Sequence, residues 1–255
     1  MAQALLFPLL QSGELPLAAV QAAVASDSSA QRLRQLQPGL AVSTDSAAAW
    51  GCAALLLAVK PQQLDAVAAA APAPAGPERP LLISVLAGVT LARLQRLFPG
   101  WCIVRAVPNT PCLVRSGLTA LAFAAEVSPE RRQWVQQLFA QVGEVLELPE
   151  PQLDAFLALT SSGPAFVALV AEAMADGAVA AGLPRQQAAH LAHRTLAGTA
   201  ALLHEQQLHT GQLKDMVSSP GGTTIAGIRA LERGGLRSAL IEAVLAAAER
   251  SRQLG

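Results

Sequence analysis

The chain has 255 residues, of which 52% are apolar and 14% charged, and its 18 basic and 18 acidic residues give a formal net charge of zero. So apolar a chain can bury a sizeable core, which excludes intrinsic disorder, and its length fits one large domain or two small ones. A chain with no basic stripe and no Tyr is not expected to bind nucleic acid or an anionic membrane surface.

Three cysteines, Cys52, Cys102 and Cys112, have no spacing typical of zinc or redox sites. An odd number of thiols is typical of the reducing cytoplasm, where we expect the protein to reside. We find no uninterrupted apolar run long enough to cross a membrane, and no positive segment precedes the apolar residues 4–10. The sequence therefore predicts neither a transmembrane helix nor a signal peptide.

Up to about residue 148, short apolar runs alternate with helical patterns. This alternation predicts an α/β fold with a Rossmann-like, doubly wound parallel sheet. The expected strands are 17–25 (a strand or short turn), 41–43, 53–59, 81–86, 101–107, 118–124 and 145–148. The expected helices are 1–12, 30–37, 46–51, 62–71, 91–98 and 129–142, and a Pro- and Ala-rich linker is expected over 72–80.

The pattern then becomes helical throughout. We expect helices over 164–181, 184–207, 212–217, 224–234 and 236–253. Two prolines flank Glu150, and we place the domain boundary there. The sequence thus predicts a sheet domain over 1–149 and an all-helical domain over 150–255.

Three of the expected strands end in residues suited to binding a ligand. Ala58, Val59, Lys60 and Pro61 end one strand, Ala87 and Gly88 follow the next, and Asn109 follows the third. Ligands of open parallel sheets bind at the carboxyl ends of the strands. Each group is equally well explained as an ordinary polar loop, but their coincidence favours a dinucleotide site.

Ser26, Ser28, Ser29 and Arg32 follow the expected strand 17–25, in a position where hydroxyls and a basic side chain accept a 2′-phosphate. Asp27 would repel that phosphate, so the pattern favours NADP over NAD without deciding between them. The glycine loop that opens a dinucleotide fold is not found before the first helix.

The segment 213–228 reads LKDMVSSPGGTTIAGI. Gly221 and Gly222 allow a positive φ and a close approach to the backbone, after Pro220 has fixed its own φ. Thr223 and Thr224 stand where a helix can begin and are suitable N-caps, so the free amides there favour a small anion such as a carboxylate. An ordinary helix–turn–helix corner explains the same residues.

Several motifs together resemble those of the pyrroline-5-carboxylate reductases. The most specific is 214–224, KDMVSSPGGTT. AVKP at 58–61, VPNTP at 107–111, SGPAF at 162–166 and the pair Asp176-Gly177 are also similar to family motifs. The resemblance covers essentially the whole chain.

The resemblance implies reduction of the C=N bond of 1-pyrroline-5-carboxylate to L-proline with hydride from NADPH or NADH, the last step of proline biosynthesis. It implies that Ser219, Gly221, Gly222 and Thr223 bind the substrate carboxylate, and that Thr224 lies near the ring nitrogen as the catalytic group. It also implies homodimers or larger homo-oligomers formed through the helical domain.

The resemblance extends the expected cofactor site to Met1, Ser26 and Asp45. Residues 1–4 are similar to the end of the family's glycine loop, and Asp45 stands where the family has Asn. We therefore expect the sheet to lack its first strand, either because the start was assigned too late or because the chain is truncated. The chain as printed is then expected to bind NADPH weakly or not at all, whereas a version extended by the missing strand is expected to be active.

We expect no metal, because no acid or Cys completes a site with His190 and His193. Two alternatives remain open at this stage. One is a non-catalytic helical dimerisation protein with a crippled nucleotide domain. The other is a reductase of a related cyclic imine or of a β-hydroxy acid.

Overall fold

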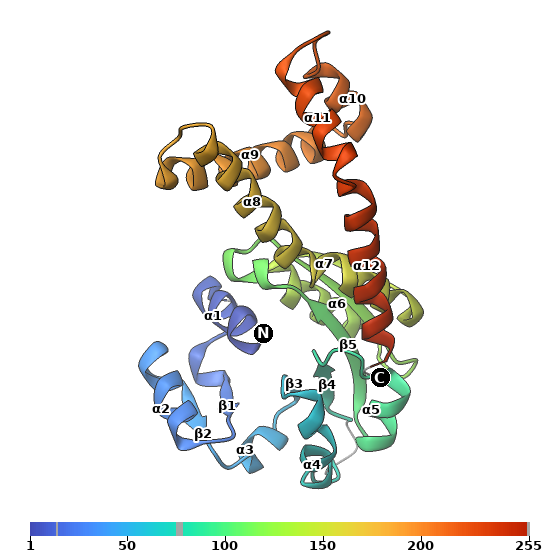
Figure 1. The fold of residues 1–255 in the computed structure, drawn as a ribbon. Coiled ribbons are helices and arrows are strands. Elements are labelled where there is room, and N and C mark those ends of the chain that lie inside the picture. Colours follow the sequence, from blue (N-terminus) through green and yellow to red (C-terminus); the bar gives the residue numbers. More distant parts are fainter. Residues whose placement is uncertain (14, 75–78, 254–255) are drawn as a thin grey trace. The chain divides into compact units, whose positions relative to one another are not determined.

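The structure, a computed structural model, describes residues 1–13, 15–74 and 79–253 (Figure 1). These form two compact units, one containing residues 1–161 and the C-terminal residues from 247 onward, the other residues 162–246. Part of the linker predicted over 72–80 lies outside the described residues.

The first unit contains a five-stranded sheet. Its strands, in spatial order, are β3 (Ala54–Leu57), β4 (Leu81–Ser84), β5 (Cys102–Pro108), β6 (Gly117–Phe123) and β7 (Gly143–Glu147). Strands β3, β4 and β5 are parallel, and β4 and β5 are buried throughout. This parallel part is the sheet that the sequence predicts.

Strand β6 corrects the expectation of a wholly parallel sheet, because it runs antiparallel to β5 and pairs Val104 with Phe123. Only residues 109–116 join the two strands, including the short 3₁₀ helix η3 (Thr110–Val114). A parallel crossover needs a dozen or more residues, so this connection cannot make one. Strand β7 is again parallel to β6.

A second, two-stranded sheet contains β1 (Gln21–Ala23) and β2 (Ala41–Ser43), which are parallel. Among the described residues, no strand pairing joins it to the larger sheet, and β3 pairs with β4 alone. Leu56 of β3 is consequently 37% exposed, although strands of this type are normally buried. The single sheet expected from the sequence is thus divided, with a ladder partner missing beside β3.

Helices surround these sheets. The α-helices of the first unit are α1 (Ala2–Ser12), α2 (Asp27–Leu36), α3 (Ala47–Trp50), α4 (Leu64–Ala69), α5 (Leu91–Leu97), α6 (Pro129–Ala140) and α7 (Leu153–Thr160). Three further 3₁₀ helices are η1 (Leu17–Ala19), η2 (Pro61–Gln63) and η4 (Glu150–Gln152). Gly13 ends α1 at φ 80°, and Thr90 caps α5 by accepting a hydrogen bond from the Arg93 amide.

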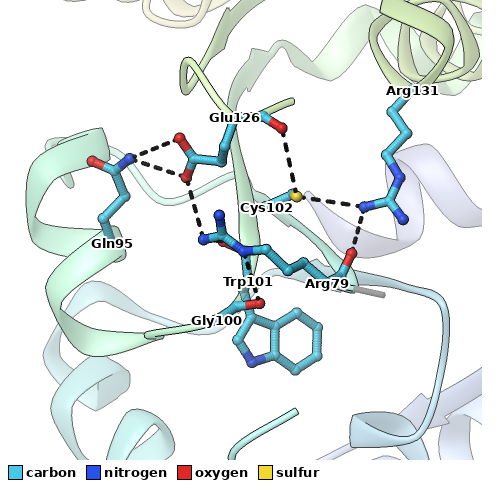
Figure 2. Close-up of polar contacts among 7 residues, drawn as sticks. All are labelled: Arg79, Gln95, Gly100, Trp101, Cys102, Glu126 and Arg131. Carbon is cyan, nitrogen blue, oxygen red and sulfur yellow. Dashed lines mark hydrogen bonds and ion pairs between the residues drawn. The ribbon is translucent and has the colours of Figure 1, made fainter. Parts of the chain in front are cut away.

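A polar cluster lies where β5 begins, at the edge of the sheet opposite the expected ligand site (Figure 2). Arg79 donates hydrogen bonds to the carbonyls of Gly100 and Trp101, and Gln95 donates to the Glu126 carboxylate. Arg131 donates to the Arg79 carbonyl and approaches Cys102 Sγ. These contacts hold the starts of β4 and β5 together.

The second unit is helical, with α8 (Gly163–Ala180), α9 (Arg185–Glu205), α10 (Thr210–Met216), α11 (Thr223–Arg233) and the first part of α12 (Leu236–Arg252). Buried Ala175, Ala188 and Ala192 let α8 and α9 pack closely. Many large apolar side chains of this unit stay exposed: Val167, Leu169, Met174, Leu183, Leu191, Leu202, Met216, Val217, Ile225, Leu231, Leu236, Leu240, Ile241 and Leu245.

One stretch, Glu150–Ala180, is long and apolar enough to cross a membrane by length and composition, and 17% of its most apolar window is buried. It is not one continuous helix, because α7 ends at Thr160 and α8 begins at Gly163. An exposed apolar helix face also fits packing against another subunit. We therefore interpret the stretch as a packing surface.

Candidate functional site

The expected cofactor residues leave neighbouring parallel strands at one edge of the sheet. Leu57, Ser84 and Arg105 are paired across β3, β4 and β5, so the segments that follow these strands emerge side by side. Ala58, Val59 and Pro61 are half-buried there, and Lys60 is exposed. The structure thus places residues 58–61 at the same edge as Ala87, Gly88 and Asn109.

The loop between β4 and α5 suits a phosphate or nicotinamide group. Gly88 has φ 75°, in the left-handed region that favours glycine, and it is buried beside half-buried Ala87. The ammonium of Lys60 is available at the end of the adjacent strand β3. A close backbone approach and an exposed cation fit the expected dinucleotide.

Asn109 has a different role from the one expected of a surface loop residue. The residue is only 5% exposed. Nδ2 donates to the carbonyl of Thr160 at 3.0 Å, and Oδ1 accepts from the amide of Leu118 at 2.9 Å. The side chain therefore ties the end of β5 to the start of β6 and to the last residue of α7.

Three further expected cofactor residues lie around the two-stranded sheet. Ser26 caps α2 and accepts from the Ser29 amide, and Asp45 accepts from the Ala47 amide at 2.9 Å. Asp45 also lines a hollow of about 340 Å³ between β1, β2 and α3. Met1 precedes α1 and is 46% exposed. Because β1 and β2 pair with neither β3 nor β4, no strand pairing holds these residues beside the β3–β5 edge.

The glycines of segment 213–228 form a tight turn in the second unit. The amide of Gly222 donates to the carbonyl of Ser219 at 3.0 Å, and Gly221 has φ 66°. A Cβ on Gly222 would lie 2.3 Å from Ser219 Oγ. Both glycines are thus required, Gly221 by its conformation and Gly222 by its close contact.

Helix α11 begins directly after this turn, at Thr223. The expectation that a threonine caps it is wrong, because Gly222 occupies the N-cap and no side chain makes a capping hydrogen bond. Glycine is suited here because the Ser219 side chain fills the space that a capping side chain would need. The amides of Thr223, Thr224 and Ile225 lie in the first turn of α11, where the helix itself offers them no carbonyl acceptor. Within the described residues, no hydrogen bond from these three amides is found. A helix start of this kind is the feature from which the sequence predicts an anion site.

Other candidate groups do not join these residues. His190 and His193 are exposed on α9, and the described residues contain no group of three or more metal-ligand side chains. Cys112 is buried in η3, and this burial raises the pKa of its thiol. A buried thiol with a raised pKa fits a packing role.

Sequence reasoning missed two polar arrangements. Arg105 is only 2% exposed, and its sole sequence signal was a charged residue inside an apolar strand. The second arrangement involves His209, whose Nδ1 accepts from the Gly211 amide while Gln212 Oε1 accepts from the His209 amide in return. This reciprocal cap begins α10, just before the glycine turn.

A Rossmann-like, mainly parallel sheet followed by a helical unit indicates a nicotinamide-dependent oxidoreductase. Residues 1–88 match the family model described as NADP oxidoreductase coenzyme F420-dependent, and residues 150–254 match that for pyrroline-5-carboxylate reductase dimerisation. The particular family follows from the second match and from the relatives below.

The pyrroline-5-carboxylate reductase of Synechocystis is 53% identical over 201 residues, covering 79% of this chain and 74% of the relative. That of Methanosarcina acetivorans is 42% identical over 235 residues, covering 91% and 87%. Among solved structures, the reductase of Coxiella burnetii has a TM-score of 0.87 at 31% identity and covers 100% of this chain and 94% of its own. The NADP-bound structure from Plasmodium falciparum has a TM-score of 0.87 at 26% identity, covering 99% and 94%. The chain belongs to the pyrroline-5-carboxylate reductase family.

Proposed function

We propose that this protein reduces 1-pyrroline-5-carboxylate to L-proline with hydride from NADPH or NADH, the last step of proline biosynthesis. Family membership supports the reaction. The observation that carries the substrate assignment is the start of α11, where a glycine turn leads into amides without acceptors. A helix N-terminus of this kind attracts a carboxylate, which the proposed substrate carries.

In the proposed substrate site, the glycine turn and the start of α11 have different roles. Ser219, Gly221 and Gly222 shape the turn, and the amides of Thr223 and Thr224 bind the carboxylate. The Thr224 hydroxyl then lies near the ring nitrogen, where it supports protonation of the imine. Protonation makes the imine carbon more electrophilic, so the remaining requirement is correct positioning.

On the cofactor side, residues 58–61, Ala87 and Gly88 hold the dinucleotide at the β3–β5 edge, and NAD(P)H supplies the hydride. Met1, Ser26 and Asp45 belong to the adenosine end. Asn109 acts through the loop that it orders. The 2′-phosphate preference follows from the serines after β1, which favour NADPH.

We further propose a division into a nucleotide domain over 1–149 and a substrate-binding and dimerisation domain over 150–255. The family model for dimerisation begins at residue 150, which supports this boundary. The exposed apolar side chains of the second unit supply the homodimer surface, and larger homo-oligomers build on it. The proposed location is the cytoplasm, which three cysteines without a disulfide fit.

The test is NADPH oxidation that depends on added 1-pyrroline-5-carboxylate, with formation of L-proline measured in the same reaction. Thr224→Val is expected to lower kcat about 100-fold, because a positioned proton donor contributes on that order. Thr224→Ser retains the hydroxyl and is expected to keep most of the activity. Thr195→Val is the matched control, since its hydroxyl bonds only within α9. Equal activity of the Val and Ser variants at position 224 would overturn the role of Thr224, and absence of L-proline would overturn the function.

A further inference from the structure

Arg105 is a buried cation at the centre of strand β5, and two carboxylates compensate it. Its Nη1 lies 3.1 Å from Glu150 Oε1, and its Nη2 lies 3.8 Å from Asp154 Oδ1. The remaining guanidinium nitrogen, Nε, is buried and has no partner within the described residues. Burying a guanidinium costs desolvation free energy, and the two carboxylates offset this cost only while both are in place.

Each carboxylate also holds a second segment of the first unit. Glu150 Oε1 accepts from the amide of Leu91 at 2.7 Å, in the first turn of α5. Asp154 Oδ1 accepts from Ser251 Oγ at 2.7 Å, near the end of α12, and Ser251 is 2% exposed. One guanidinium thereby connects β5, the start of α5, helix α7 and the end of α12.

Two of these connected segments, the start of α5 and the end of α12, lie at positions relevant to the proposed reaction. Leu91 directly follows the loop with Ala87 and Gly88, where the cofactor is proposed to bind. Helix α12 carries the chain back into the first unit at residue 247. The order of the cofactor loop and the anchoring of the returning helix therefore depend on the same side chain.

We propose that Arg105 is a positioning residue that couples the β4–α5 cofactor loop to the C-terminal end of α12. Glu150 transmits its effect to the loop, and Asp154 with Ser251 transmits it to the helix. Arg105 does not touch the cofactor. The part of this inference that concerns NADPH rests on the proposed function, whereas the coupling itself does not.

The experiment is hydrogen–deuterium exchange of the full chain, following peptides that contain Leu91 and Ser251, together with direct NADPH titration. In Arg105→Met, both peptides are expected to exchange several-fold faster, although the hydrogen bond of Ser251 goes to Asp154 and not to Arg105. The Kd for NADPH is expected to rise about three- to thirtyfold, the range of typical coupling effects. Glu150→Gln is expected to speed exchange of the Leu91 peptide and to raise the Kd for NADPH. Ser251→Ala is expected to speed exchange of the α12 peptide.

Arg132→Met is the matched control, because Arg132 makes a similar 3.0 Å ion pair with Glu147 but at the surface. It is expected to change neither peptide nor the Kd. Unchanged exchange at Leu91 or Ser251 in Arg105→Met would overturn the coupling, and a Kd change no larger than that of the control would overturn the cofactor role. If Arg105→Met does not fold, Glu150→Gln and Asp154→Asn decide in the same way. Loss of imine turnover in the wild type would refute the proposed function and leave the exchange result valid.

Discussion

The side-chain amide of Asn109 donates to the carbonyl of Thr160 at 3.0 Å, across 51 residues of sequence. Thr160 is the last residue of α7, and the first unit ends one residue later, at Ser161. A second bond runs beside it, from Ser161 Oγ to the carbonyl of Pro108 at 3.3 Å. The end of β5 thus holds the place where the chain leaves the first unit.

The first prediction concerns this contact. Asn109→Ala leaves the Leu118 amide and the Thr160 carbonyl without their partner, and we expect it to lower the free energy of unfolding by about 1–3 kcal/mol. Urea denaturation measures the change. Ser161→Ala, which removes a single longer bond, is expected to cost less. An Asn109→Ala variant as stable as the wild type would show that the contact contributes nothing.

The second prediction separates the two glycines of the turn. Gly221→Ala is strained by its φ of 66°, and a left-handed conformation costs a residue with a Cβ about 1–2 kcal/mol. Gly222→Ala instead brings its Cβ to 2.3 Å from Ser219 Oγ. We expect Ser219→Ala to restore stability partly in Gly222→Ala and not at all in Gly221→Ala, as measured by thermal unfolding.

Gly227 provides the control for these variants, because it lies inside α11 and a Cβ there meets no atom within 4 Å. Gly227→Ala is expected to stabilise the helix by about 1 kcal/mol. The turn variants are also expected to raise KM for the imine, because they shift the amides of Thr223 and Thr224. An unchanged KM in both would contradict the carboxylate site.

The third prediction concerns the cap of α10. His209 accepts from the Gly211 amide at 3.1 Å, so His209→Ala is expected to cost about 1 kcal/mol of stability, the typical value of an N-cap. His209→Asp keeps an acceptor and is expected to retain most of that stability. His204→Ala, at an exposed position before the loop, is the control. Equal unfolding midpoints for the Ala and Asp variants at position 209 would contradict a capping role.

The fourth prediction concerns the thiols. Burial raises the pKa of the Cys112 thiol, and its hydrogen bonds lower it only in part. A raised pKa keeps the thiol protonated over a wider pH range, and the thiolate is the reactive form. Iodoacetamide at neutral pH is therefore expected to label half-buried Cys52 in the native protein and to reach Cys112 only after unfolding, as followed by peptide mass spectrometry. Rapid native labelling of Cys112 would refute the expectation.

The raised pKa of the Cys112 thiol also determines the direction in which the free energy of unfolding changes with pH. The unfolded chain releases this proton at a lower pH than the folded chain, so the free energy of unfolding falls as pH rises past the ordinary thiol pKa. Cys112→Ala is expected to reduce this alkaline loss. A steeper alkaline loss in the variant would contradict the burial argument.

The sequence by itself predicted most of the strands and helices, although not α7, and it singled out the segment 213–228 as a candidate substrate site. Apolar runs such as 81–86 and 101–107 mark buried strands because their whole length faces the core, and caps such as Thr90 act through residues three positions away. The turn at Gly221 and Gly222 is equally local. Strands, caps and turns of this kind depend on residues close together in the sequence, so the sequence alone predicts them.

Only the tertiary structure decided what depends on residues distant in sequence. The division of the sheet and the antiparallel direction of β6 are properties of strand pairing, which the pattern of one strand does not contain. Arg105 pairs with Glu150, and Asn109 donates to Thr160. Both partners lie more than forty residues away along the chain, in α7 and the turn before it. A polar side chain at the end of a strand fits ligand binding and internal anchoring equally well, and only the tertiary structure shows the anchoring contacts that Asn109 makes with α7 and β6.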